Sequence, residues 1–174
     1  MPRDDGRASP RRAADAAAAV LRAGFSPDER AYATAEQCGT FALALFDELA
    51  ALGVPARLVA IGSDPAWEAD APPAGGALAR RFPPRLARSH LAHVLVSIDG
   101  VLLDIEGAQG DAELAGRYGA TGAVALDRAG LVRRMGSGDD RPLYYDREFY
   151  TSARARLRSA FAGVPGPPAG ERGR

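Results

Sequence analysis

The chain has 174 residues, 47% of them hydrophobic, and its 22 basic and 22 acidic side chains give a formal net charge of zero. This length suits one domain with its own hydrophobic core. The balanced charge does not favour nucleic acid or an anionic membrane as a partner, and no apolar run approaches the roughly 20 residues of a membrane-spanning helix. A single cysteine permits neither an internal disulfide nor a cysteine-rich metal site. The polar N-terminus does not resemble a secretory signal, so we expect a cytoplasmic protein. Because the chain has one cysteine and two histidines, we also expect no metal site, and we expect no cofactor.

The N-terminal part of the chain predicts a short disordered segment followed by a helix. Residues 1–9 are polar and expected to be disordered. A helix is predicted from Pro10 to Ala23, with Ser9 as its N-cap and Gly24 as its stop signal. Its apolar stripe is thin, which indicates a position on the outside of the domain.

The following helix has a much clearer pattern. Thr34 and Gln37 fit a capping box at its start, and Gly53 stands where a C-terminal cap belongs. Cys38 therefore falls in the first turn. Apolar residues at helical spacing predict one buried face. They are Phe41, Ala42, Leu45, Leu49 and Leu52.

A strand and a long loop come next. Residues 57–61 are predicted to form a strand that ends at Gly62, and residues 62–88 carry several prolines and glycines without a regular pattern. Loops of this length are lids or binding loops, or else disordered. This loop contains the only tryptophan, Trp67, and an arginine-rich run that either binds an acidic partner or is solvated. The run comprises Arg80, Arg81, Arg85 and Arg88.

A hairpin follows the loop. Residues 91–98 alternate and are rich in Val, Leu and Ile, and residues 101–105 return as the partner strand. Asp99 and Gly100 between them are typical of a two-residue hairpin turn. Such a turn sets the register, because the residues that flank it must face each other.

This register sorts the side chains of the hairpin onto two faces. On one face His93 and Asp104 are diagonal neighbours whose side chains can meet, and Glu106 lies directly opposite His93 as a competing partner. That face also carries Leu95, and taken alone it is equally consistent with a hairpin face exposed to water. The other face is nearly all apolar and is the predicted core face. It comprises Ala92, Val94, Val96, Ile98, Val101, Leu103 and Ile105.

The C-terminal part predicts further short elements. A helix is expected over 111–118, a strand over 122–126, a helix capped by Asp127, and a final helix over 146–162. Residues 163–174 are rich in Gly, Pro and Arg and are expected to be disordered. The order of elements predicts a single α+β domain over residues 10–162, with helices packed on a small antiparallel sheet.

The candidate chemistry centres on Cys38. A lone cysteine is often only a small buried hydrophobe. A helix N-terminus, however, favours a thiolate, and its free N–H groups can stabilise an oxyanion. One of the two histidines, His93, lies on a strand beside a carboxylate. A nucleophile, a base and a group that orients the base are the parts that thiol catalysis requires.

Two segments carry a family resemblance. The sequences CGTFALALFDELAALGVPARLVAIG and HVLVSIDGVLLDIEG resemble the core of the transglutaminase-like branch of the papain-like superfamily, over roughly residues 34–107. The resemblance implies a papain-like or transglutaminase-like α+β fold with N-terminal helices packed on the sheet. It also implies Cys38 as nucleophile, His93 as base and Asp104 as orienting acid, and matches Gly53–Arg57 to the turn after the cysteine helix.

The implied function is a cysteine-dependent acyl-transfer enzyme that works through a thioester acyl-enzyme. Amide or peptide hydrolase, deamidase and acyltransferase all remain open, with a protein, a peptide or a small amide as substrate. Glu106 is the alternative orienting acid, Gln37 a possible supporting residue, and His90 a possible base. His90 and His93 project to opposite faces of a strand, which makes them poor joint metal ligands. The alternative function is a catalytically inactive binding or assembly module of the same fold, and the sequence does not indicate an oligomeric state.

Overall fold

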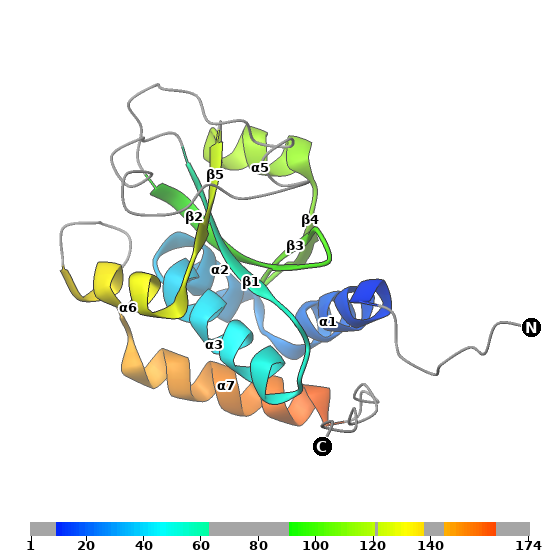
Figure 1. The fold of residues 1–174 in the computed structure, drawn as a ribbon. Helices are drawn as coiled ribbons and strands as arrows, with labels where there is room; N and C mark the ends of the chain where they lie inside the picture. The colour runs from blue at the N-terminus through cyan, green and yellow to red at the C-terminus, as the bar shows by residue number, and fades with distance from the viewer. Residues whose placement is uncertain (1–9, 63–90, 121, 138–144, 163–174) are drawn as a thin grey trace, which may run out of the picture.

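The computed structural model describes residues 10–62, 91–120, 122–137 and 145–162. Their fold is α+β, with one antiparallel sheet whose strand order is β4-β3-β2-β1-β5 (Figure 1). The predicted fold class is thereby confirmed at this coarse level. The strands are β1 (Arg57–Gly62), β2 (Leu91–Ile98), β3 (Val101–Asp104), β4 (Gly107–Gln109) and β5 (Gly122–Leu126).

Helices cover both faces of this sheet. On one face α1 and α3 pack against the strands, and α7 packs behind them, whereas α5 lies on the opposite face (Figure 1). None of the helices in the described ranges is long and apolar enough to cross a membrane. The helices are α1 (Pro10–Gly24), α2 (Pro27–Ala35), α3 (Cys38–Ala51), α5 (Asp111–Tyr118), α6 (Arg128–Ser137) and α7 (Arg147–Phe161).

The hairpin of β2 and β3 has the predicted turn and register. Ile98 pairs with Val101, and the pairing continues outward to Leu103 opposite Val96. Asp99 and Gly100 both have positive φ, at 50° and 79°. This is the backbone that a two-residue turn of the primed type requires, and Asp-Gly is a favoured pair for it.

The far end of the hairpin differs from the prediction. The strand predicted over 101–105 ends at Asp104, because the chain turns again and β4 begins at Gly107, which pairs with Asp104. Glu106 therefore lies in the turn between β3 and β4 and is not on a strand opposite His93. Gly107 has φ 107°, a backbone conformation that L side chains rarely adopt.

Neither face of the hairpin is open to water. The predicted core face packs against α1 and α3, while the second face is buried beneath α5. Leu95 and Leu102 on this second face are fully buried together with Leu114 of α5. The alternation of polar and apolar residues suggested a solvated face, but α5 provides the cover that the alternation alone does not predict.

The helical region before Cys38 also differs from the prediction. Thr34 lies inside α2, so the predicted capping box of Thr34 and Gln37 is wrong. The capping box that does form starts α2 instead: Ser26 Oγ accepts from the N–H of Glu29 at 3.3 Å, and Glu29 Oε2 accepts from the N–H of Ser26 at 2.9 Å. The next helix, α3, begins at Cys38 itself.

The first helix is packed more closely than its thin stripe suggests. Ala14, Ala17, Ala18 and Leu21 of α1 are buried, and α1 packs against β4, β3 and α7. Alanine side chains allow a close approach of the helix to the sheet. A Cβ on Gly107 would lie only 3.2 Å from the carbonyl oxygen of Ala18. The prediction that α1 lies on the outside of the domain is therefore wrong, because the helix packs in the hydrophobic core.

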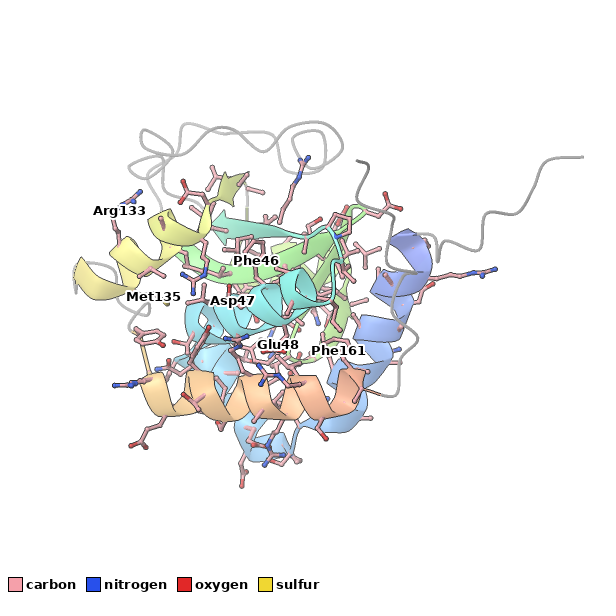
Figure 2. All side chains as sticks on the ribbon, turned by 60° about the horizontal axis from the view of Figure 1, so that its bottom comes forward. Phe46, Asp47, Glu48, Arg133, Met135 and Phe161 are labelled. Carbon is pink, nitrogen blue, oxygen red and sulfur yellow. The ribbon has the colours of Figure 1, made fainter. Side chains whose placement is uncertain are left out.

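An ion-pair network ties α3 to α7. Glu48 is buried between the two helices (Figure 2), with Arg154 Nε at 2.6 Å and Arg158 Nη2 at 2.9 Å from its Oε1. Burial works to raise the pKa of Glu48, but the two guanidinium groups outweigh it and hold the pKa below its usual range. Because a buried carboxylate needs such partners, the pairing aligns α3 on α7.

Replacement of Gly107 tests the close contact between α1 and the sheet. We expect Gly107→Ala to lower the free energy of unfolding by about 1–3 kcal/mol, because the residue has positive φ and its Cβ would meet α1. Gly116→Ala is the matched control, since a Cβ there meets open space in α5 and should stabilise by about 0.5–1 kcal/mol. Chemical denaturation measures both, and equal effects of the two variants would contradict the contact.

Candidate functional site

Cys38 lies where a nucleophilic thiol would be activated. It is the first residue of α3, and the N-cap residue Gln37 makes no side-chain capping hydrogen bond. The N–H groups of the first turn of a helix lack intrahelical partners and lie at its positive end, and Cys38 belongs to that turn of α3. The thiol is not in a disulfide, and the residue is buried, with 4% of its surface exposed.

His93 lies on β2 beside an irregularity in the sheet. Ile61 of β1 pairs with His93, but the next residue, Gly62, pairs with Leu91, so Ala92 is an extra residue. Such bulges bend a strand and re-aim side chains, and they are common beside active sites. The bulge lies directly next to His93, which is 1% exposed.

Asp104, and not Glu106, is the carboxylate that contacts His93. Nε2 of His93 lies 3.1 Å from Oδ2 of Asp104. The other oxygen, Oδ1, accepts from the backbone N–H of Glu106 at 2.8 Å and from Nε2 of Gln109 at 2.9 Å. The Glu106 carboxylate is directed elsewhere, to an ion pair with Arg117 at the surface. The alternative that the sequence left open between the two carboxylates is decided in favour of Asp104 as the partner of His93.

The surroundings of His93 favour its charged form. Burial alone would lower the pKa of this imidazole, but the hydrogen bond to Asp104 and the nearby Cys38 thiol outweigh burial and raise the pKa from 6.5 to about 9. These contacts of the ring therefore favour its imidazolium form. Its Nδ1 makes no hydrogen bond to any described residue, so with Nε2 on Asp104 this is the nitrogen left to serve the thiol.

Two residues that sequence reasoning missed complete this arrangement. Tyr118, at the end of α5, stacks on the His93 ring with centroids 4.3 Å apart and planes 8° from parallel. Gln109, on β4, holds Asp104 as described above. Neither has a sequence motif. The one available signal is Gly107, because an isolated glycine in a strand pattern suggests a bulge or a close backbone approach.

Gln37, which precedes Cys38 in the chain, is buried and has one half of its side-chain amide without a partner in the described structure. Its Oε1 accepts a hydrogen bond from Thr40 Oγ1 at 2.8 Å, whereas its Nε2 has no partner among the described residues. Gln109 Oε1 and the Tyr118 hydroxyl are buried without a partner in the same part of the structure. Buried polar groups without partners are rare in proteins and mark places where a ligand or a water binds.

Other sequence-predicted features lie outside the described residues. These are the predicted disordered ends at residues 1–9 and 163–174, nearly all of the loop predicted over 62–88 with Trp67 and the arginine-rich run, and His90. In the ranges that the structure describes, no group of three or more His, Cys, Asp or Glu side chains is arranged to hold a metal ion.

Comparison with family models, with curated proteins and with solved structures finds no match to this chain. The assignment of function therefore depends on the geometry around Cys38 and His93 and on the sequence resemblance.

The charge state of His93 is measurable by NMR titration of the imidazole carbon. The chain has two histidines, and His90→Gln leaves one signal to follow. Because the folded pKa is raised, we expect His93 to remain protonated at pH 7 and to lose its proton near pH 9. Asp104→Asn should lower this midpoint, whereas Glu106→Gln should move it much less. A midpoint at or below 6.5 in the parent would contradict the described environment.

Proposed function

We propose that the protein is a cysteine-dependent acyl-transfer enzyme of the transglutaminase-like type, with Cys38 as nucleophile, His93 as acid and base, and Asp104 as orienting acid. The observation that carries the proposal is the buried His93, which bonds Asp104 through Nε2 and whose pKa the Cys38 thiol helps to raise. An orienting carboxylate on one ring nitrogen and a thiol near the ring form a constellation for thiol catalysis.

The acylation step follows from these positions. The Cys38 sulfur, as thiolate, attacks the carbonyl carbon of an amide or ester and forms a C–S bond, while the carbonyl π electrons move to oxygen. When the tetrahedral intermediate collapses, the C–N or C–O bond breaks and the His93 imidazolium donates its proton to the leaving group. The product is a thioester on Cys38 with a neutral His93.

Deacylation reverses the role of the imidazole. Neutral His93 accepts a proton from water or from an amine as that nucleophile attacks the thioester carbonyl, and the thiolate leaves. Water gives hydrolysis or deamidation, and an amine gives acyl transfer. Asp104 keeps the ring in one orientation throughout, because its Oδ1 is fixed by two other donors.

In this proposal two groups of the α3 N-terminus stabilise the oxyanion. The N–H groups of the first turn of α3 supply the helix-terminal donors. The side-chain Nε2 of Gln37 supplies a second donor, since it is buried and unpartnered within the described structure while Thr40 holds the other end of the amide. This gives Gln37 a role beyond the capping box in which the sequence placed it.

The papain-like or transglutaminase-like fold is part of the same proposal. An antiparallel sheet with a helix that starts at Cys38, and with His93 and Asp104 on neighbouring strands, is compatible with the order of elements implied by the resemblance. The substrate is a protein, a peptide or a small amide.

The second candidate, a non-catalytic binding or assembly module, is supported by burial. Cys38 is 4% exposed and His93 is 1% exposed. In this second candidate the buried thiol and imidazole serve packing, and a substrate does not reach them. The two candidates make opposite predictions about a small reagent.

Alkylation of Cys38 by iodoacetamide between pH 5 and 9 separates the candidates. Because Cys38 is the only cysteine, every thiol adduct reports on it. We expect the parent to react well below pH 7, since an imidazolium stabilises the thiolate, and His93→Ala to lose this low-pH reaction by about tenfold or more. His90→Ala is the matched control and should keep it. A thiol that reacts only after unfolding would instead support the binding module.

A test of Gln37 as an oxyanion donor requires a reaction that forms an oxyanion. Acylation of Cys38 by p-nitrophenyl acetate passes through an oxyanion, whereas alkylation by iodoacetamide does not. The mass of the intact protein reports the extent of acylation. We expect Gln37→Met, which keeps the length of the side chain without the amide, to slow acylation on the order of 100-fold. Alkylation should change little. Equal losses in both reactions would show that Gln37 only supports the position of Cys38.

A further inference from the structure

The stack of Tyr118 on His93 is not required by the roles proposed above. Tyr118 is half-buried, and its ring lies 4.3 Å from the imidazole with the planes 8° from parallel. Its hydroxyl is buried and bonds no described residue, so a hydrogen bond does not explain why the side chain lies there. The ring itself is the part that makes the contact.

A stacked aromatic ring has two effects on an imidazole. It restricts rotation of the imidazole about χ2, and its negatively polarised face attracts a cation above it. Burial raises the pKa of the Tyr118 hydroxyl, so this ring stays neutral wherever His93 titrates. The attraction therefore favours the imidazolium over the neutral ring.

Other groups that act on His93 come from each neighbouring element. Asp104 on β3 is bonded to it, and Cys38 of α3 also acts to raise its pKa. Glu106, in the β3–β4 turn, interacts electrostatically with His93, and this carboxylate is paired with Arg117 of α5. Tyr118 is the aromatic contact of the ring within the described structure, which gives it a role that none of the charged groups duplicates.

The end of α5 is built to hold this ring. Leu114, one turn earlier, is fully buried in the cluster beneath α5. Gly119, directly after Tyr118, has φ 59° and ends the helix in the left-handed conformation typical of a C-terminal cap. Arg117 pairs with Glu106 and also lies over the Tyr118 ring, 5.5 Å from its centroid. These contacts anchor α5 on both sides of Tyr118.

We propose that Tyr118 is a positioning residue, whose stacked ring holds the His93 imidazole with Nε2 on Asp104 and Nδ1 left for Cys38, and which favours the imidazolium. The inference deepens the proposed function and rests on it for its catalytic meaning. The stack itself is testable without turnover. Failure of the acyl-transfer proposal and failure of this one are therefore distinguishable.

The experiment compares variants that keep or remove the ring, all in the His90→Gln background. Tyr118→Phe keeps the ring, while Tyr118→Leu and Tyr118→Met remove it. We expect removal to lower the NMR titration midpoint of His93 by about one unit, and to slow the low-pH alkylation of Cys38 by about tenfold. Tyr118→Phe should match the parent in both readouts.

Leu114→Val is the matched control, because it loosens the packing of α5 by one methylene and leaves the stacked ring in place. Thermal unfolding by circular dichroism confirms that each variant is folded before titration. The proposal is overturned if His93 has the same titration midpoint in Tyr118→Leu and Tyr118→Met as in the parent, because Tyr118 would then serve packing alone. It is also overturned if Tyr118→Phe loses as much as Tyr118→Leu, or if Leu114→Val causes the same shift.

Discussion

The hydrogen bonds that stabilise one buried carboxylate, Asp104, determine how the segments around the candidate site are arranged. An ionised carboxylate that leaves water costs several kcal/mol unless its oxygens are bonded. Asp104 is 3% exposed, and both of its oxygens are bonded, by His93 from β2, by the N–H of Glu106 in the following turn, and by Gln109 from β4. One side chain thus joins three successive segments of the chain. The Asp104 carboxylate also determines that Nε2 of His93 makes the hydrogen bond to it, so that Nδ1 is the ring nitrogen without a described partner.

The helical side of the site depends on a second compensated carboxylate. Glu48 lies between α3 and α7, where Arg154 and Arg158 neutralise it. Because these pairs align α3, they also define where its first residue, Cys38, projects. The thiol is carried by a helix that is anchored at its middle, while the imidazole is carried by a strand that is bent by a bulge. Cys38 is the first residue of α3, and His93 lies near the start of β2.

Much of this arrangement was predictable because it depends on local chemistry. The Asp99-Gly100 turn determines the register, and the register brings His93 and Asp104 to one face. Other parts depend on tertiary contacts that no local pattern encodes. Tyr118 meets His93 only because α5 folds back over the sheet, and within α5 only Leu114 is buried, which is too little for a periodic signal. The predicted capping box is wrong because Thr34 lies inside α2, a separate helix that Ser26 and Glu29 cap, and α3 begins after Gln37 without a side-chain cap.

The two halves of the site belong to different hydrophobic clusters. Cys38 packs in the large cluster of α1, α3 and α7, whereas the face that carries His93 belongs to the small cluster beneath α5. Local opening follows such cooperative units, and a small unit opens at a lower free energy than a large one. An excursion of α5 would remove the Tyr118 ring from His93, while β2 and the helix that carries Cys38 stayed folded. The aromatic stack on the proposed base can therefore be lost without global unfolding and without displacing the proposed nucleophile.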